Sequence, residues 1–395
     1  MAVLQLRSPL SPEERLEKRK LIVRDLIALL SLFAVTLVLA TLTYFLFRSF
    51  SLHRQELAQR WLARGRTAMA AKHPEQAIQA LRSALEYQPG ERRTEIELAS
   101  ALAAAGHNRE AAAYFATLLD AEPGNGLINL ELARLAAKQG NESQAIESYE
   151  RALDGTWQGD GYLRRLSVRL ELTRYLLSQH DYAHARTQLL IASGNAPDEQ
   201  KVKLEIAGLM EQAQDPSSAL EIYRKLAQRR PEPLEALEGA GRTAEALGRF
   251  ALVRQYMGRA LDHPDFEKRP EAERQTIRNS FSGATRLLAL YPSPELSVRE
   301  RAARILHNVK TARAHFMACA AGQVTAQPAL AARWQQVPQN LSLPSLERDP
   351  QLEQQLMTLV YDTEKQAAVT CGAPTGEDAL LLKMAQAAGE WGQQP

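Results

Sequence analysis

The chain has 395 residues, of which 45% are apolar and 24% charged, a balance typical of folded rather than disordered proteins. Its 48 Lys and Arg residues nearly cancel its 46 Asp and Glu residues, so no net field attracts nucleic acid, and we expect no nucleic-acid binding. The two cysteines, Cys319 and Cys371, are too few for a disulfide-built scaffold or for a closed four-ligand zinc site of the usual type.

The first predicted element is a transmembrane helix at residues 26–47. These 22 residues carry no charge, and as a helix they would be about 33 Å long, enough to cross a hydrocarbon core of roughly 30 Å. The apolar run is longer than that of a cleaved signal peptide, and Arg48 follows it in place of a small-residue cleavage site. We therefore expect an uncleaved, single-pass anchor preceded by a short tail, residues 1–25.

Basic residues predict the orientation of this anchor. Six Lys and Arg residues lie between Arg7 and Arg24, whereas only Arg48 and Arg54 lie in the first ten or so positions after the apolar run. The positive-inside bias then places the N-terminal tail in the cytoplasm. The large C-terminal part is expected outside it, which in a Gram-negative bacterium is the periplasm.

Residues 58–265 repeat with a period of 34 residues over six units, interrupted by one six-residue insertion after the third unit. A small or β-branched residue recurs in phase at Ala77, Ala111, Ala145, Ala185, Ala219 and Val253. A larger apolar residue follows each of these at four positions, and proline closes most units. Two short helices per unit explain this spacing, because small residues let helix backbones approach and the larger residue fills the gap one turn later. One pair cannot bury its apolar face alone, so successive pairs stack into a solenoid.

This pattern resembles the tetratricopeptide-repeat family. The first unit holds the family's signature positions most fully, at Trp61, Gly65, Ala77, Leu81, Ala84 and Pro89. The resemblance implies an all-α fold, an α–α superhelical solenoid whose first helices line a concave, protein-binding groove. Trp157 departs from the pattern, since it replaces the closing proline of the third unit where the insertion begins.

The groove is the candidate binding site. In the family, the residue after the small mid-helix position of each first helix points into the groove. Four of the six residues at this position are arginines, Arg66, Arg134, Arg174 and Arg242. They could bind the carboxylates of an acidic protein partner, although arginine is also a good helix former on a wet surface. Leu62, Ile96 and Leu130 stand where the family's chaperone-tail clamp carries polar groups, so we do not expect binding of a chaperone C-terminus.

Further helices are predicted beyond the repeats. Residues 271–291 and 295–321 form a divergent helical pair, within a segment 266–321 that caps the open end of the solenoid, and Ser297 with Glu300 forms a predicted capping box. A linker with a short helix is expected at 322–345, and two closing helices at 346–395. A disulfide between Cys319 and Cys371 would tie the tail back in an oxidising compartment; two buried thiols are the alternative.

Motifs for catalysis are missing from the sequence. It contains no phosphate-binding glycine loop, no H-E-x-x-H and no G-x-S-x-G. His180 and His184 have a spacing that two metal ligands on one helix could use, but no cysteine or matched acidic partner accompanies them. We therefore expect no catalytic residue, no cofactor and no metal.

These features predict a non-catalytic, membrane-tethered scaffold for protein–protein interactions at the cell envelope. One alternative is a regulatory adaptor in envelope biogenesis or secretion, similar to anchored repeat proteins that control lipopolysaccharide synthesis. Those proteins carry a rubredoxin-like metal tail with paired C-x-x-C motifs, which two lone cysteines cannot supply. Another alternative is an enzyme whose active site lies after residue 322, a stretch without histidine.

Overall fold

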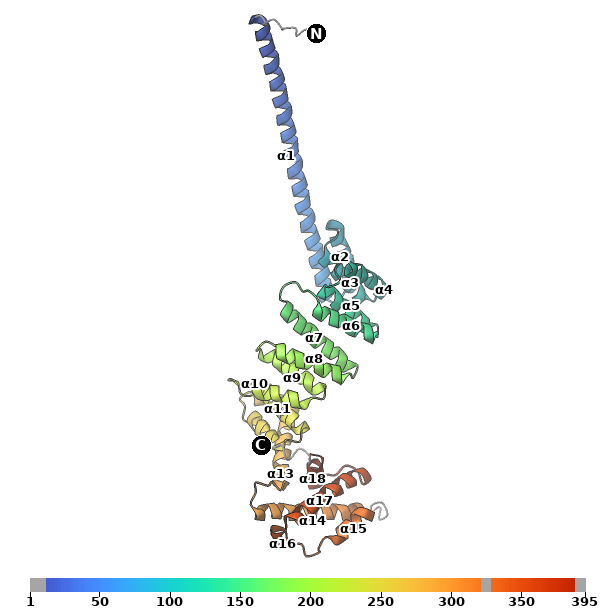
Figure 1. The fold of residues 1–395 in the computed structure, drawn as a ribbon, viewed down its shortest axis with the longest axis vertical. Helices are drawn as coiled ribbons and strands as arrows, with labels where there is room; N and C mark the ends of the chain where they lie inside the picture. The colour runs from blue at the N-terminus through green and yellow to red at the C-terminus, as the bar shows by residue number, and fades with distance from the viewer. Residues whose placement is uncertain (1–11, 321–327, 388–395) are drawn as a thin grey trace, which may run out of the picture. The chain divides into compact units, whose positions relative to one another are not determined.

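The structure is a computed structural model that describes residues 12–320 and 328–387. Within these ranges the regular structure is helical, with eighteen α-helices and one short 3-10 helix, and the only strand-like feature is a single β-bridge between Asn125 and Thr156. The predicted all-α fold is thus confirmed (Figure 1). The chain divides into two compact units, Met1–Gly161 and Tyr162–Pro395, and the division falls at the end of the insertion after the third repeat.

The first helix, α1 (Pro12–Ala70), joins two elements that the sequence predicts separately. It contains the apolar run 26–47 and continues without a break into the first helix of the first repeat (Figure 1). The apolar window of α1 is fully exposed, and by length and composition α1 is the one described helix that could cross a membrane. Its last turns pack against α2 (Pro74–Tyr87).

Three helix pairs form the repeats of the first unit. They are the end of α1 with α2, α3 (Arg92–Ala105) with α4 (Asn108–Ala121), and α5 (Gly126–Lys138) with α6 (Glu142–Asp154). The in-phase residues Ala77, Ala111 and Ala145 are all 0% exposed, which confirms the predicted 34-residue phase. Gly65 shows why a small residue is needed, because a Cβ at this position would lie 2.7 Å from Leu81 Cγ.

Three further pairs open the second unit. They are α7 (Gly161–Ser178) with α8 (Tyr182–Asn195), α9 (Gln200–Gln212) with α10 (Pro216–Leu226), and α11 (Leu234–Ala246) with α12 (Phe250–Leu261). Ala185, Ala219 and Val253 are again 0% exposed. A Cβ on Gly241 would lie 2.5 Å from Met257 Cε, the same close approach of small and large residues as in the first repeat. Six repeats therefore share one packing rule.

The C-terminal helices pack differently from a simple seventh pair. After the 3-10 helix Phe266–Lys268 they are α13 (Glu271–Leu290), α14 (Val298–Ala320), α15 (Pro328–Gln336), α16 (Leu343–Arg348), α17 (Pro350–Thr370) and α18 (Gly376–Gln386). α13 packs on α12, whereas α14 packs mainly against α17, and α18 contacts α13, α14 and α17. Ser297 caps α14 as expected, since its Oγ accepts from the Glu300 N–H at 3.3 Å and donates to the Glu300 carboxylate at 2.8 Å.

The segment predicted as a linker, 322–345, is folded where the structure describes it. The side chains of Leu330 and Trp334 on α15 are buried, and Trp334 Nε1 donates to Thr363 Oγ1 of α17 at 3.0 Å. Pro328 is the first residue of α15 and Pro344 the second residue of α16, positions at the start of a helix where proline is tolerated. Residues 322–327 of the predicted linker lie outside the described part of the chain.

Candidate protein-binding surface

The four candidate arginines lie on the first helices of their repeats, Arg66 on α1, Arg134 on α5, Arg174 on α7 and Arg242 on α11. Their side chains are 45–54% exposed, so each can be reached from solvent. Each also contacts a carboxylate of this chain. The first-helix arginines, as we call these four residues, are therefore exposed but charge-compensated.

The pairing follows the repeat. Arg66 Nε donates to Glu97 Oε2 at 2.9 Å, and Arg66 Nη2 donates to Glu97 Oε1 at 2.7 Å, so the guanidinium meets the carboxylate as a fork. Arg174 forms the equivalent pair with Glu205, and Ser100 Oγ donates to Glu131 at 3.1 Å. All three contacts join residues 31 positions apart. A separation of 31 residues is shorter than the 34-residue period by about one helical turn. Each carboxylate therefore lies on the first helix of the next repeat, about one turn before the position equivalent to its partner.

Two arginines pair by other routes. Arg134 Nη1 donates to Glu131 within its own helix at 2.7 Å. Arg242 Nη2 donates at 2.9 Å to Glu211 of α9, in the preceding repeat. Glu211 also accepts from the Tyr223 hydroxyl at 2.6 Å, and burial together with this hydrogen bond raises the pKa of Tyr223 well above its usual range. Tyr223 therefore stays protonated and holds the Glu211 carboxylate in place.

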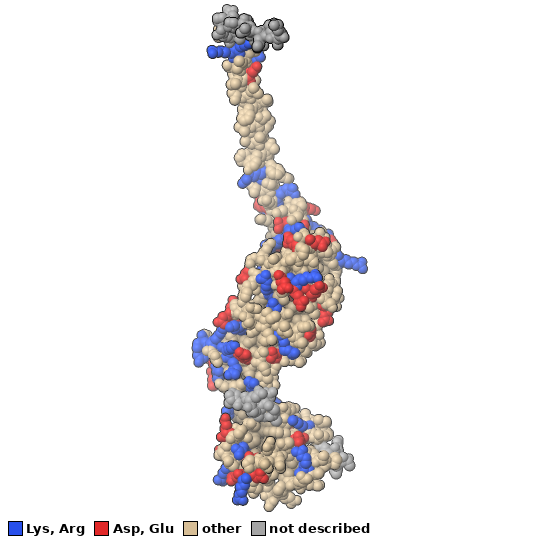
Figure 2. All heavy atoms as spheres, in the orientation of Figure 1, with Lys and Arg blue, Asp and Glu red and all other residues tan. Residues whose placement is uncertain are grey.

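The charge pattern of this surface is mixed. Figure 2 shows Lys and Arg side chains interspersed with Asp and Glu over the helices that follow α1, while the middle of α1 carries neither. An acidic partner would have to exchange its carboxylates with those of Glu97, Glu205 or Glu211. Exposed ion pairs contribute only about 0–1 kcal/mol each, so this exchange is energetically accessible.

The apolar residues beside the arginines belong to the core. Ile96 and Leu130 are only 5% and 6% exposed, and Leu62 is half-buried. These three positions therefore have no polar group to offer and little surface for a partner. Within each unit, the charged groups exposed on the first helices include these arginine–carboxylate pairs.

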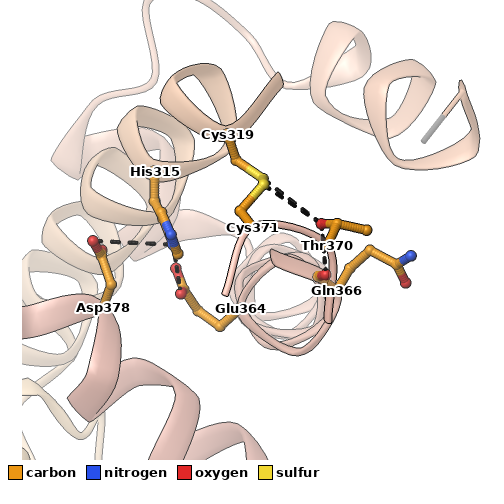
Figure 3. The surroundings of a disulfide bond; sticks show 7 residues. All are labelled: His315, Cys319, Glu364, Gln366, Thr370, Cys371 and Asp378. Atoms are coloured by element: carbon orange, nitrogen blue, oxygen red, sulfur yellow. Dashed lines mark hydrogen bonds and ion pairs between the residues drawn. A yellow bond between two sulfur atoms is a disulfide. The ribbon is translucent and has the colours of Figure 1, made fainter. Parts of the chain in front are cut away.

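The other residues singled out from the sequence lie apart from this row. His180 Nδ1 lies 3.1 Å from the Tyr182 hydroxyl, whereas His184 Nδ1 lies 2.5 Å from Asp181 Oδ2. The two histidines thus engage different partners. Cys319, at the end of α14, is joined by a disulfide to Cys371, which follows α17, and their Cα atoms lie 5.9 Å apart (Figure 3).

The carboxylate row was missed by reasoning from the sequence, although a signal for it is present. Glu97, Glu131 and Glu205 each lie 31 residues after the groove position of the preceding repeat. Aligning successive repeats and looking 31 residues beyond each groove position would therefore find these glutamates. Charged residues on an amphipathic helix are usually solvated, so these glutamates were interpreted as solvent-exposed residues rather than as partners of the arginines.

Paired helices that stack through small residues at a fixed phase define an α-helical repeat protein. Models of the tetratricopeptide repeat match residues 58–91, 96–160 and 170–233. These matches identify tetratricopeptide repeats in this part of the chain. The unmatched stretch between residues 160 and 170 coincides with the end of the insertion.

Comparison with solved structures gives matches of low sequence identity. PilF of Pseudomonas aeruginosa is 19% identical, with a TM-score of 0.38 over 55% of this chain and 97% of that protein. PilW, described as a widely conserved type IV pilus biogenesis factor, is 17% identical, with a TM-score of 0.37 and the same coverage. MamA is 14% identical, with a TM-score of 0.33 over 48% of this chain and 95% of that protein. No curated protein sequence matches the chain significantly.

Proposed function

We propose that the chain is a non-catalytic scaffold, tethered to a membrane by α1, that binds a protein partner through the first-helix surface of its repeats. The observation that carries this proposal is the continuity of α1, in which an exposed apolar stretch of membrane-spanning length runs without a break into the first repeat.

The continuity of α1 limits how far the repeats can lie from the bilayer. Ten residues separate Phe47, the end of the apolar run, from Ala58, the start of the first repeat, so Ala58 lies eleven positions after Phe47. As helix these residues span about 16 Å. A partner in or on the same membrane would then meet the first repeat at a high effective concentration, so modest affinity per contact suffices.

The first-helix arginines supply the chemistry for an acidic partner. Each guanidinium already meets a carboxylate in a geometry that a partner's Asp or Glu can reproduce. Exchange of one exposed carboxylate for another changes little free energy by itself, so the spacing of several such contacts along the repeats would set specificity.

Two observations support a periplasmic location for the repeats. Basic residues are concentrated before the apolar run, which favours a cytoplasmic N-terminus. The disulfide between Cys319 and Cys371 fits an oxidising compartment, because cytoplasmic thiols are usually kept reduced. The two arguments are independent and favour the same side of the membrane.

Capture of the full chain from its own membranes tests the role of the arginines. We expect a charge-reversed variant, Arg66→Glu with Arg174→Glu, to recover its partner at least about tenfold less well than the native chain, because the new carboxylates would face those of the partner, and like charges placed against each other in an interface repel strongly. A charge-swapped variant, Arg66→Glu/Glu97→Arg with Arg174→Glu/Glu205→Arg, is the matched control, since it keeps two internal ion pairs but moves the guanidinium groups.

The swapped variant separates recognition from structure. If the arginines contact the partner, the swapped chain should recover it as poorly as the reversed chain. Full recovery by the swapped chain would show that the pairs serve only the packing of neighbouring repeats, and unchanged recovery by the reversed chain would show that the arginines are not used.

A further inference from the structure

Three ionisable side chains from three helices converge beside the disulfide. They are His315 of α14, Glu364 of α17 and Asp378 of α18, and their side chains point toward one another (Figure 3). His315 Nδ1 lies 2.8 Å from Glu364 Oε2 and 4.0 Å from Asp378 Oδ2. One ligand atom from each of the three lies within 4.8 Å of the others.

Two of the four carboxylate oxygens in this cluster lack hydrogen-bond donors. The Glu364 side chain is 0% exposed, and its Oε1 is buried without a partner. Asp378 Oδ1 is likewise buried without a partner. A buried acceptor without a donor is energetically costly, so native proteins rarely leave two of them in one place.

The charges of the cluster are also unbalanced. Two carboxylates face one imidazole, and His315 can offset at most one negative charge, and only when it is protonated. With both carboxylates ionised, the cluster therefore carries more negative than positive charge.

We propose that His315, Glu364 and Asp378 bind one divalent transition-metal ion, with Zn²⁺ as the best chemical match. One imidazole nitrogen and two carboxylate oxygens are ordinary zinc ligands, and two carboxylates neutralise a divalent ion. With metal–ligand bonds of about 2.0–2.2 Å, tetrahedral ligand atoms lie roughly 3.4 Å apart. The two separations from His315 Nδ1, 2.8 Å and 4.0 Å, bracket that value, and all three ligand atoms lie within 4.8 Å of one another, so modest side-chain movements would complete the site. The imidazole disfavours Mg²⁺ and Ca²⁺, which prefer oxygen.

Such an ion would connect helices that the disulfide leaves separate. The disulfide joins the ends of α14 and α17, and α18 has no covalent link to either of them apart from the chain itself. An ion held by all three helices would fix α18. From α18, Lys383 forms an ion pair of 3.1 Å with Glu245 of α11, in the last repeat. The ion would thus stabilise the contact of the C-terminal helices with the end of the repeats.

Metal analysis of the purified full chain in detergent tests this site. After equilibrium dialysis against micromolar Zn²⁺, we expect one zinc ion per chain, and binding at least about tenfold weaker for Glu364→Gln and for Asp378→Asn, since loss of one ligand removes both a bond and a charge. His307→Gln is the matched control and should bind like the native chain, because His307 lies on the same helix but pairs with exposed Glu377 at 2.9 Å.

A second control addresses other histidines. His180→Ala with His184→Ala should retain one zinc ion per chain, and X-ray absorption of the native chain should show one imidazole and otherwise oxygen ligands. Zinc content no higher than in the buffer, equal affinity in Asp378→Asn and the native chain, or loss of zinc only in the His180/His184 variant would each overturn the proposal. Asp378, whose side chain is 28% exposed, keeps the test valid if the fully buried Glu364 cannot be replaced without unfolding.

Discussion

Replacing Phe115 with alanine is expected to lower the free energy of unfolding of the first unit by about 3–5 kcal/mol. Phe115 on α4 is 0% exposed and belongs to the core formed by successive repeats. Its ring fills the gap one turn after Ala111, and neighbouring repeats cannot close that gap without moving whole helices. Because each repeat contacts only its neighbours, the loss should appear locally, as faster backbone hydrogen exchange in α3, α4 and α5 of the full chain.

Thr117→Ala is the control for Phe115. Thr117 is exposed on the same helix and donates only to the Ala113 carbonyl of its own helix, at 3.0 Å. It should change the free energy of unfolding by less than about 0.5 kcal/mol. Similar exchange rates for the two variants would show that the phase of large residues does not form the core.

Replacing Leu32, Val35 and Leu39 with arginine is expected to release the chain from the membrane. Each arginine near the centre of a spanning helix costs about 2.5–3.5 kcal/mol, so three should abolish insertion. The native chain should remain in the pellet after alkaline carbonate extraction, and the triple-arginine variant should not. A triple-alanine variant at the same positions should stay in the pellet, because it introduces no charge.

Intact-mass measurement of the native chain distinguishes an anchor from a signal sequence. An uncleaved anchor gives the mass of a chain that retains residues 26–47. A mature chain that lacks these residues and is found in the soluble fraction would contradict tethering by α1. It would leave the repeat array and its binding surface intact, since the first repeat begins at about residue 58.

Much of the fold could be predicted because repeats encode it locally. The 34-residue spacing of small residues such as Ala111 and Ala145 can be recognised in this sequence alone, without knowledge of long-range contacts or of related sequences. Both residues are 0% exposed, as this spacing predicts. The continuity of α1 could also have been read, because neither Gly nor Pro occurs between Pro12 and Gly65. Treating the apolar run and the first repeat as separate elements hid that signal.

The cluster of His315, Glu364 and Asp378 could not be predicted in this way. Glu364 lies 49 residues after His315, and no local spacing relates the two or links them to α18. Their convergence depends on α14 packing against α17 rather than pairing mainly with α13. A sequence predicts a metal site through paired C-x-x-C motifs, or through an H-x-x-x-H pair that has a third ligand. This sequence offers neither, so it predicts no metal site. The three proposed ligands come together only when α14, α17 and α18 pack.

Site-specific photo-crosslinking in native membranes tests most directly whether the first-helix surface binds the partner. A crosslinkable residue would replace Arg66 or Arg134 on first helices, or Thr117 or Glu147 on the exposed faces of second helices. We expect one partner protein to be crosslinked from both first-helix positions and from neither second-helix position. Crosslinking of that partner from Thr117 and Glu147 instead, or equally from all four positions, would contradict binding through the first-helix surface.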